Sequence, residues 1–236
     1  MLHSVNLSDY MIRNPLTITP KDDLSVAVKL ILENKVSGLC VANEKNVLLG
    51  VLSEIDCLNA GLAQSNTKIM LGTTVVSDYI ITEPVKICPD EDLYQAVNSI
   101  IRHRVSGLCV VDPDDVLVGV LSEMDCLRAV LSAIYNDQRE ADKVFMHMTE
   151  NVEHCDSDSA LEVVARDMLE KGRRRRPVTR EGRLVGQITC RQILSAISKN
   201  GWDKSIVEEH MSASVEDCQL QDDIVTIANN MLKKGR

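Results

Sequence analysis

The stretch Gly50–Leu58, GVLSEIDCL, returns as GVLSEMDCL at Gly119–Leu127. A shift of 69 residues lays Asp9–Leu58 over Asp78–Leu127 without a gap, and about half of the positions are identical. A repeat of this length indicates a duplicated structural unit. A functional group in one copy should therefore have a counterpart in the other.

Composition limits the classes of protein to consider. The chain has 236 residues, enough for one large or two modest domains. Aromatic residues make up only 3%, so the core must be aliphatic and stacking platforms for nucleic-acid bases are effectively absent. The net charge of −9 also argues against a nucleic-acid partner or an anionic membrane surface.

Three features favour a cytoplasmic protein. No apolar run approaches the length of a membrane span. The N-terminus, MLHSVNLSDYMI, lacks the cationic and apolar regions of a signal peptide. The cysteines recur at equivalent positions, Cys40 with Cys109 and Cys57 with Cys126, inside apolar runs, which favours reduced core thiols over disulfides.

Each of the first two copies predicts a unit of strand, helix, strand, strand and helix. A short β-favouring run lies between the prolines at 15 and 20 and again between those at 84 and 89. The amphipathic helices are expected at Asp22–Lys35, with Val26, Leu30 and Ile31 at helical spacing, and at Glu91–Arg104, with Val97, Ile100 and Ile101. The hairpins are expected at Val36–Val41 with Val47–Leu52 and at Val105–Val111 with Val116–Leu121, and the second helices from Ser53 and Ser122.

A third, weaker copy begins near Met148 and a fourth at Met211. The third is expected to form a helix around Val163, Val164, Met168 and Leu169, a hairpin at Arg173–Thr179 and Leu184–Thr189 with Glu181 and Gly182 in the turn, and a helix at Thr189–Ile197. The fourth repeats Met148–Arg173 and ends at Arg236, so it predicts a first strand and a first helix without a hairpin. Because the missing half would leave apolar surface and a sheet edge exposed, we expect a truncated sequence or a further tail.

These features together resemble the CBS (cystathionine-β-synthase) motif: a proline-flanked strand, an amphipathic helix, VSGLCVV, a short turn and a corner of the form G-h-h-S-x-x-D, in which h is apolar. The resemblance covers nearly the whole chain as three full motifs and one partial motif. Cys40 and Cys109 depart from it, since the family usually has proline there, whereas Pro177 of the third copy keeps the proline.

The resemblance implies an α+β fold of tandem CBS motifs that pair into one complete and one incomplete Bateman module. The first pair is expected at residues 1–140, with motifs at about 7–65 and 76–135. The second is expected at 141–236, with a complete motif at about 144–198 and a partial one at 206–236. Such modules commonly dimerise into a flat disc and bind AMP, ADP, ATP or S-adenosylmethionine between the paired motifs, so a homodimer with an adenosyl ligand and no required cofactor is expected.

The repeated corners, Ser53 with Asp56 and Ser122 with Asp125, have two readings. A serine before a helix with an acid three residues on is close to a capping box, and Thr189 with Gln192 in the third copy is also acceptable as a cap. Alternatively, one carboxylate can accept hydrogen bonds from both ribose hydroxyls, with more strength than an amide oxygen. The resemblance places ribose binding on this serine and this aspartate, so we assign Ser53, Asp56, Ser122 and Asp125 to the site and expect the third copy to bind adenosine poorly.

The resemblance also places an adenine pocket on the first strand and on the stretch before the hairpin. The corresponding residues are Thr17, Ile18, Val36 and Gly38 in the first copy and Lys86, Ile87, Val105 and Gly107 in the second. For the aliphatic residues, a place in the sheet core holds under either reading. The phosphate candidates are Lys35, His103, Arg104 and Arg128, each of which also suits a helix end without any ligand.

The run Arg173–Arg176 is the one dense basic segment. Alternation along a strand puts Arg174 and Arg176 on one face and Arg173 and Arg175 on the other, so at least one pair must pack or pair internally. This basic run could hold a phosphate tail, it could pair with an acidic partner, or it could be a salt-bridged strand start. The pair His154-Cys155 is too sparse for a zinc site, so no metal is expected.

Two functions of different classes follow. The first is a regulatory sensor that binds an adenosyl ligand in the cleft between paired motifs and passes the signal to a partner, such as an enzyme or transporter, by a conformational or oligomeric change. The second is a ligand-free module for structure, dimerisation and protein interaction. An enzyme ranks third, because the sequence shows no catalytic motif such as G-x-S-x-G, a P-loop or H-E-x-x-H.

Overall fold

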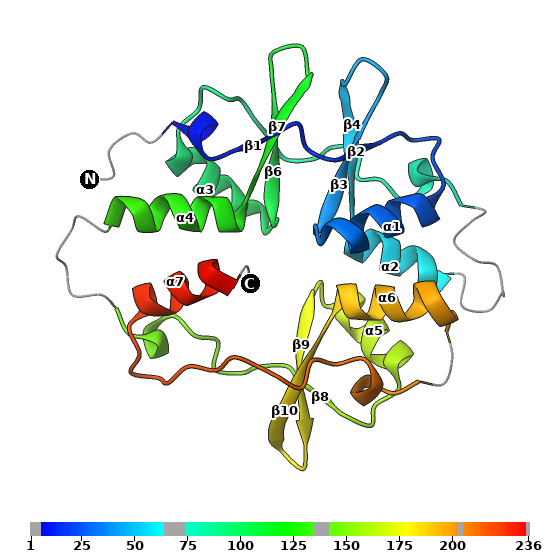
Figure 1. Cartoon of the computed structure of the whole chain (residues 1–236), viewed down its shortest axis with the longest axis vertical. Coiled ribbons are helices and arrows are strands. Elements are labelled where there is room, and N and C mark those ends of the chain that lie inside the picture. The colour runs from blue at the N-terminus through cyan, green and yellow to red at the C-terminus, as the bar shows by residue number, and fades with distance from the viewer. Residues whose placement is uncertain (1–5, 64–73, 135–141, 203–204, 235–236) are drawn as a thin grey trace.

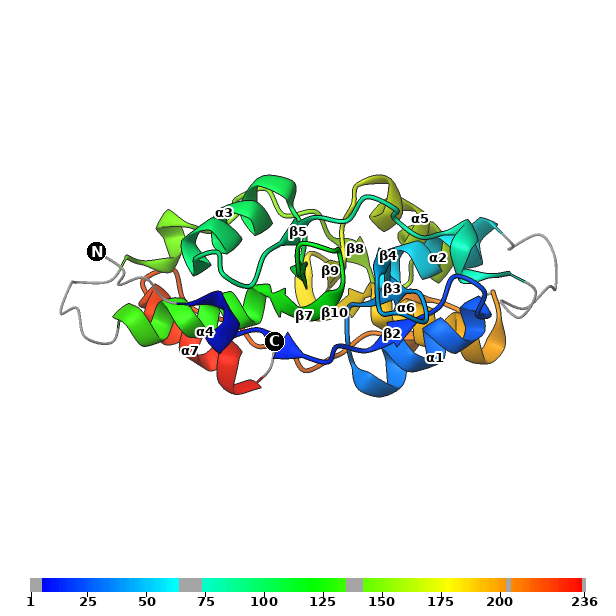
Figure 2. The ribbon, with the colours of Figure 1, turned by 90° about the horizontal axis from the view of Figure 1, so that it is seen from above.

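The chain forms a flat disc in which copies of one small α+β unit surround the centre (Figures 1 and 2). The computed structural model describes residues 6–63, 74–134, 142–202 and 205–234. Motifs 1 and 2 lie side by side on one half of the disc, and motif 3 and the partial motif 4 form the other half. The fold class is the α+β arrangement of tandem repeats that the sequence predicts.

Motifs 1 to 3 share the predicted order of elements. Motif 1 contains β2 (Thr17–Ile18), α1 (Leu24–Asn34), β3 (Gly38–Ala42), β4 (Leu48–Ser53) and α2 (Glu54–Ala63). Motif 2 contains β5 (Lys86–Ile87), α3 (Leu93–His103), β6 (Gly107–Val111), β7 (Leu117–Ser122) and α4 (Glu123–Ile134). Motif 3 contains β8 (Cys155–Asp156), α5 (Leu161–Glu170), β9 (Arg175–Arg180), β10 (Arg183–Thr189) and α6 (Cys190–Asn200).

Local chemistry sets the ends of the first helices. Asp23 caps α1 by accepting a hydrogen bond from the Ser25 amide, and Asp92 caps α3 through the Gln95 amide. Lys35 and Arg104 end the two helices in the left-handed conformation, with φ of 55° and 54°. Both helices are therefore one or two residues shorter at each end than predicted.

The buried face of the first helices differs in part from the prediction. Ile31 and Ile100 are buried as expected, but Val26 and Ile101 are 45% and 68% exposed, and Val163 on α5 is 64% exposed. In each helix the residue next to the exposed one in sequence is buried instead. Helical spacing alone does not decide which of two neighbouring apolar stripes faces the core. The buried residues are Leu24, Ala27, Val28 and Ile31 on α1, Leu93, Ala96 and Ile100 on α3, and Leu161, Val164, Ala165 and Met168 on α5.

Paired motifs exchange their opening segments. β1 (Ile12–Arg13), which precedes motif 1, pairs antiparallel with β7 of motif 2, and Leu7 lies in the core of motif 2. In the reverse direction Ile81, which precedes motif 2, pairs with Val51 on β4, and Val76 lies in the core of motif 1. Motifs 1 and 2 are therefore interlocked, although their sheets are separate.

The sheets of motifs 1 and 2 also face each other through an apolar contact. Cys40 and Leu48 of motif 1 form one buried cluster with Cys109, Val111 and Leu117 of motif 2. At the hairpin tips, the Leu48 amide donates to the Asp115 carbonyl at 2.9 Å and the Leu117 amide to the Asn46 carbonyl at 2.9 Å. Figure 1 shows the two hairpins, β3–β4 and β6–β7, side by side.

The two halves of the disc meet through helices. α2 packs on α6, and α4 packs on α7 (Ile224–Lys234) of motif 4. Residues of motifs 1 and 3 share one core cluster, which includes Leu58 and Leu194. Trp202 adds a hydrogen bond across this interface, from its indole nitrogen to the Gly61 carbonyl at 2.8 Å.

The first strand predicted for motif 4 is absent. Cys218 and Gln219, which correspond to β8 of motif 3, are irregular and exposed. In motifs 1, 2 and 3 this short strand pairs in parallel with the first hairpin strand, so without a hairpin it has no partner in the described chain. The helix prediction is confirmed by α7, which packs on α4 but has no fully buried residue: Met231 is 42% exposed, whereas its counterpart Met168 is fully buried.

Candidate functional site

A cavity of about 280 Å³ lies between motif 1 and the β1–β7 edge of motif 2. Leu16, Val36 and Gly38 line it from motif 1, with Ile12 and Val120 on the other side. Val36 and Gly38, which belong to the predicted adenine pocket, both line this cavity. Thr17 and Ile18 lie on the adjoining strand β2, with Thr17 exposed and Ile18 buried in the core.

The equivalent residues of motif 2 occupy matching places. Ile87 is buried on β5, Val105 precedes β6, and Gly107 begins β6. Lys86 is engaged on the surface, where its Nζ lies 2.6 Å from Asp115 Oδ1.

The packing of the hairpins requires glycine at Gly38 and Gly107, the two glycines of the predicted adenine pockets. A Cβ on Gly38 would lie 2.8 Å from the Leu52 carbonyl oxygen, and one on Gly107 would lie 2.8 Å from that of Leu121. Close packing of the two hairpin strands therefore explains these glycines without a ligand.

The two serine–aspartate corners have nearly the same geometry. Ser53 donates to Asp56 Oδ2 through its amide at 2.8 Å and through its hydroxyl at 2.5 Å. Ser122 donates to Asp125 Oδ2 at 3.0 Å and 2.5 Å in the same way. One carboxylate oxygen of each aspartate is thus used in the helix cap, which leaves the other oxygen for further chemistry.

The remaining carboxylate oxygen differs between the copies. Arg128 donates to Asp125 Oδ1 at 3.2 Å, and the Asp125 side chain is almost completely buried. In motif 1 the position of Arg128 is occupied by Asn59, which is exposed. Arg128, predicted as a phosphate candidate, is therefore paired with the predicted ribose ligand instead.

The third copy uses its corner as a cap. Thr189 and Gln192 form a complete capping box at the start of α6. The Gln192 side-chain nitrogen donates to the Ser212 hydroxyl at 3.0 Å, so the amide is engaged at both ends. This confirms that glutamine keeps the cap in motif 3.

Arg174 of motif 3 reaches the end of the motif 1–motif 2 interface. Ser37 and Ser106, which immediately precede β3 and β6, lie with their hydroxyls 3.5 Å apart. Arg174 donates to the Ser106 hydroxyl at 2.7 Å. The sequence pointed only to a basic run, and nothing in it indicated that one arginine would cross to the other half of the disc.

Arg176 has the internal pairing that the alternation predicted for at least one face of the run, whereas Arg175 is exposed. Arg176 is buried at 2% exposure and pairs with Glu153 at 2.9 Å and with Asp167. Lys171 also pairs with Asp167, at 2.8 Å. The Lys171 ammonium, which donates a hydrogen bond, and the Arg176 charge lower the pKa of the Asp167 carboxyl.

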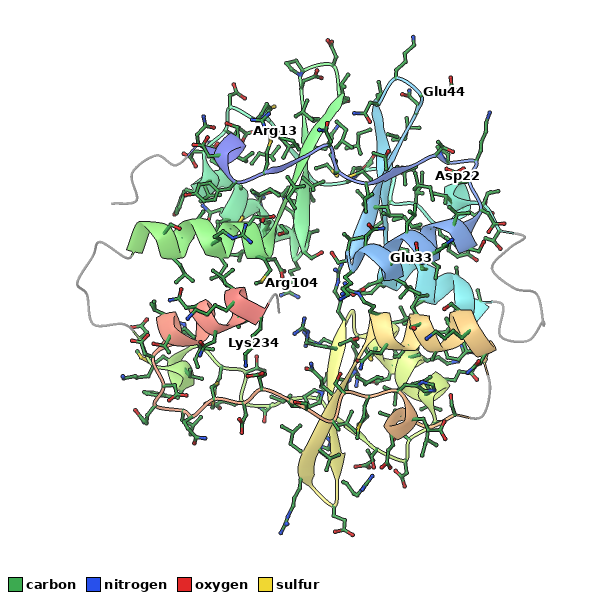
Figure 3. The ribbon with its side chains drawn as sticks, in the orientation of Figure 1. Arg13, Asp22, Glu33, Glu44, Arg104 and Lys234 are labelled. Atoms are coloured by element: carbon green, nitrogen blue, oxygen red, sulfur yellow. The ribbon has the colours of Figure 1, made fainter. Side chains whose placement is uncertain are left out.

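The remaining phosphate candidates lie at helix ends. Lys35 and Arg104 are exposed, and Figure 3 shows Arg104 near the middle of the disc, with Lys234 of α7 also there. His103 lines a separate hollow on the exposed face of α3 together with Tyr94 and Arg102, and it is not among the residues lining the first cavity. Within the described residues, no three His, Cys, Asp or Glu side chains gather as a candidate metal site.

The repeated units match a known family. Residues 7–63, 76–132 and 141–199 each match the CBS domain. The chain belongs to the CBS domain family. The resemblance drawn from the repeated corners is thereby confirmed.

Protein MJ1225 of Methanocaldococcus jannaschii, itself uncharacterised, is similar over most of its length. It is 26% identical over 237 residues, which cover 93% of this chain and 82% of the relative. Its crystal structure has a TM-score of 0.88 over 98% of this chain and 90% of that chain, at 22% identity. The same disc-like arrangement of CBS motifs is therefore found in an experimental structure.

Other relatives are similar over one part only. The γ-3 subunit of 5'-AMP-activated protein kinase from Sus scrofa is 29% identical over 108 residues, which cover 44% of this chain and 21% of the subunit. Inosine-5'-monophosphate dehydrogenase of M. jannaschii is 31% identical over 122 residues, 50% of this chain and 22% of the enzyme. Because the chain spans about a fifth of these proteins, the prediction that it is not an enzyme stays a prediction.

Proposed function

We propose that this CBS protein is a regulatory module that binds an adenosyl ligand, such as AMP, ADP, ATP or S-adenosylmethionine, between motifs 1 and 2. The observation that carries the proposal is the cavity at that interface, lined by Val36 and Gly38 of the expected adenine pocket. The similarity to a subunit of an AMP-activated kinase supports a nucleotide as the ligand class.

In the proposed binding mode, the purine, the ribose and the phosphate each contact a different group of residues. Ile12, Leu16, Val36 and Val120 supply apolar contacts for the purine faces. At the serine–aspartate corners, the carboxylate oxygen that the serine does not use accepts from the ribose hydroxyls; in Asp125 this oxygen is shared with Arg128. The full proposed set is Thr17, Ile18, Val36, Gly38, Ser53, Asp56, Lys86, Ile87, Val105, Gly107, Ser122 and Asp125.

Arg174 joins the candidates for phosphate contact. Its guanidinium already lies on Ser106, where the sheets of motifs 1 and 2 meet, and guanidinium groups recognise phosphate well. Since Arg174 belongs to motif 3, a phosphate held there would connect the two halves of the disc. A ligand that binds one arrangement of the halves better than another would shift the population towards it.

The assembly around this chain is part of the proposal. We propose that residues 1–140 and 141–236 act as the two modules, that the protein forms a homodimer in the cytoplasm, and that its signal passes to an enzyme or transporter. In the described structure, α2 packs on α6 and α4 on α7 within one chain. Within the described residues, no helix is both long and apolar enough to cross a bilayer.

Calorimetric titration with AMP, ADP, ATP and S-adenosylmethionine tests the function. We compare the wild type with the double variant Asp56→Asn/Asp125→Asn, in which the amide oxygen can keep the cap, as Gln192 does in motif 3. A ligand at 100 times its Kd should stabilise the wild type by about 2.7 kcal/mol. The double variant should bind at least tenfold more weakly, because ribose loses a charged acceptor.

The matched control is Asp23→Asn/Asp92→Asn, which changes two helix caps that do not belong to the proposed binding set. Neither these aspartates nor Asp56 and Asp125 line the cavity itself, so the comparison tests the serine–aspartate corners and not helix capping in general. These substitutions should leave affinity unchanged. Equal affinity in wild type and the Asp56/Asp125 variant would contradict the ribose assignment. A wild type that binds none of the four compounds would overturn the sensor and favour the ligand-free interaction module.

A further inference from the structure

Cys40 and Cys109 meet where the sheets of motifs 1 and 2 face each other. They occupy equivalent places on β3 and β6, and their sulfurs lie 3.7 Å apart. Both side chains are 4% exposed and belong to the buried cluster that joins the sheets. Motif 3 has Pro177 at this position, so the pair is a property of motifs 1 and 2.

The surroundings distinguish the two thiols. On the neighbouring strand Thr17 is opposite Cys40, whereas Lys86 is opposite Cys109. Contact with the Cys40 thiol lowers the pKa of Cys109, burial opposes this shift, and the charge of Lys86, which also pairs with Asp115, adds to the lowering. For comparison, burial raises the pKa of Cys57 to about 12 and that of Cys190 to about 12.

Small reagents have a route to this pair. Cys40 lines the cavity of about 280 Å³ between motif 1 and the edge of motif 2. A cavity of this size admits a molecule such as hydrogen peroxide, which is little larger than water. Cys109 does not line this cavity, but its sulfur lies 3.7 Å from that of Cys40, so a small reagent approaches the pair from the Cys40 side.

We propose that Cys40 and Cys109 form a reversible disulfide that ties β3 to β6 when the protein meets a hydroperoxide. A disulfide has sulfurs about 2.05 Å apart, so the two must approach by about 1.7 Å from the reduced structure. The bond closes a loop of about 70 residues that includes the hairpin of motif 1 and the first elements of motif 2. It fixes the spacing of the two sheets at the wall of the cavity.

The chemistry balances with one hydroperoxide per disulfide. The Cys109 thiol releases its proton to the solvent, its thiolate attacks a peroxide oxygen, the O–O bond breaks, and the leaving hydroxide takes the Cys40 proton to form water. The Cys40 thiolate then attacks the Cys109 sulfenic acid, the S–O bond breaks, and hydroxide leaves and takes a proton from the solvent. In sum, two thiols and hydrogen peroxide give one disulfide and two waters.

Peptide mapping tests the proposal on the folded protein without any nucleotide, so its outcome is independent of the proposed function. The reduced chain is treated with hydrogen peroxide, its free thiols are alkylated, and it is digested without reductant. We expect a Cys40–Cys109 cross-linked peptide that dithiothreitol removes. We also expect the thermal midpoint of the oxidised protein to rise by several degrees, because the cross-link restricts the unfolded chain.

Two variants separate the pair from general oxidation. Cys40→Ser should abolish both the cross-link and the rise of the midpoint. Cys57→Ser/Cys126→Ser should retain both, since these cysteines share the repeat spacing but lie in separate core clusters. Absence of the cross-link while exposed Cys218 is oxidised would overturn the proposal, as would a cross-link that forms only in urea.

Discussion

Gly50, Gly119 and Gly186 open the repeated corners, and each lies against the backbone of another motif. A Cβ on Gly50 would lie 2.5 Å from the Ile81 carbonyl oxygen, and one on Gly119 would lie 2.9 Å from that of Ile12. On Gly186 the same atom would lie 2.7 Å from the Ser212 carbonyl oxygen. The glycine of the corner therefore allows the exchanged opening segment to cross the hairpin.

Gly50→Ala should destabilise the protein by about 1–3 kcal/mol, because the new methyl group meets backbone that cannot rotate away. Urea unfolding of the wild type and the variant measures the difference. Gly61→Ala is the control, since its Cβ would meet the end of the Ile197 side chain, which can move. Equal stability of Gly50→Ala and wild type would contradict the crossing as the reason for the glycine.

The serine–aspartate corners show how one pair of residues can have two uses. Their Oδ2 atoms serve the helix caps, and the second oxygen of Asp125 already holds Arg128. Asn59 at the Arg128 position of motif 1 leaves Asp56 without this arginine. If the ribose binds at these corners, Asp56 is the aspartate with less competition.

The short opening strands depend on the hairpins that they join. β2, β5 and β8 have only two residues each and pair with β3, β6 and β9. Motif 4 has the corresponding residues but no hairpin in the described chain, and its segment is irregular. Two residues cannot form a strand alone, because their hydrogen-bonding groups need a neighbour.

β9 carries an arginine where the other motifs carry leucine. Arg176 occupies the place of Leu39 and Leu108, and it stays buried because Glu153 and Asp167 neutralise it. A buried arginine that loses a partner keeps its desolvation cost. The hairpin of motif 3 therefore depends on an ion network where the others depend on apolar packing.

Asp167→Asn should destabilise the protein by about 1–3 kcal/mol at neutral pH, since Arg176 keeps only Glu153 as a charged partner. Because the pKa of Asp167 is lowered in the folded state, its contribution is present above about 3.9 and is lost as the pH falls through the folded-state value. Denaturant unfolding between pH 7 and strong acid measures this.

Glu162→Gln is the matched control on the same helix. Glu162 pairs with Arg166 on the solvent side of α5, and such pairs contribute about 0–1 kcal/mol. An Asp167→Asn effect as small as that of Glu162→Gln would show that Arg176 does not need the carboxylate.

The contact between α2 and α6 joins the two halves of the disc. Glu54 at the start of α2 is buried and lies 3.4 Å from Arg191 of α6. Burial raises the pKa of Glu54, and the nearby Arg191 and Arg174 charges oppose the shift without cancelling it. A charge of motif 1 is therefore compensated in part by charges of motif 3.

Glu54 should make the wild type less stable as the pH rises. A carboxyl with a raised folded-state pKa binds its proton more tightly when folded, so stability falls from about pH 4.3 up to the folded-state value and is then constant. The loss is at most about 1.4 kcal/mol per pH unit in that window. Glu54→Gln should remove it, so the stability difference between the two proteins should change with pH. A pH-independent difference would contradict the raised pKa.

Trp202 is the one tryptophan of the sequence. It lies at the interface between motifs 1 and 3, where its indole nitrogen donates a hydrogen bond to the Gly61 carbonyl. Motifs 1 and 3 share a core cluster, so the two halves should unfold together. We expect tryptophan fluorescence and far-ultraviolet circular dichroism to report one coincident thermal transition. Separate transitions would show that the halves are independent domains.

The repeat, the order of elements within motifs 1 to 3, the cap at Thr189 and the turn at Glu181 and Gly182 could be predicted from the sequence, because they depend on residues close along the chain. The strand β1 and the caps Asp23 and Asp92 were not predicted. The prediction that Val26 and Ile101 face the core was wrong, because helical spacing does not decide which side of an apolar stripe faces the core.

Which distant groups meet could be seen only in the folded chain. Cys40 reaches Cys109 across 69 positions, Arg174 reaches Ser106 across 68, and Glu54 faces Arg191 from another motif. These contacts depend on how motifs pair and how halves stack, and long-range packing leaves no periodic signal along the chain. The same packing explains why the strand predicted in motif 4 does not form: its local sequence resembles the others, but the described residues contain no hairpin strand to pair with it.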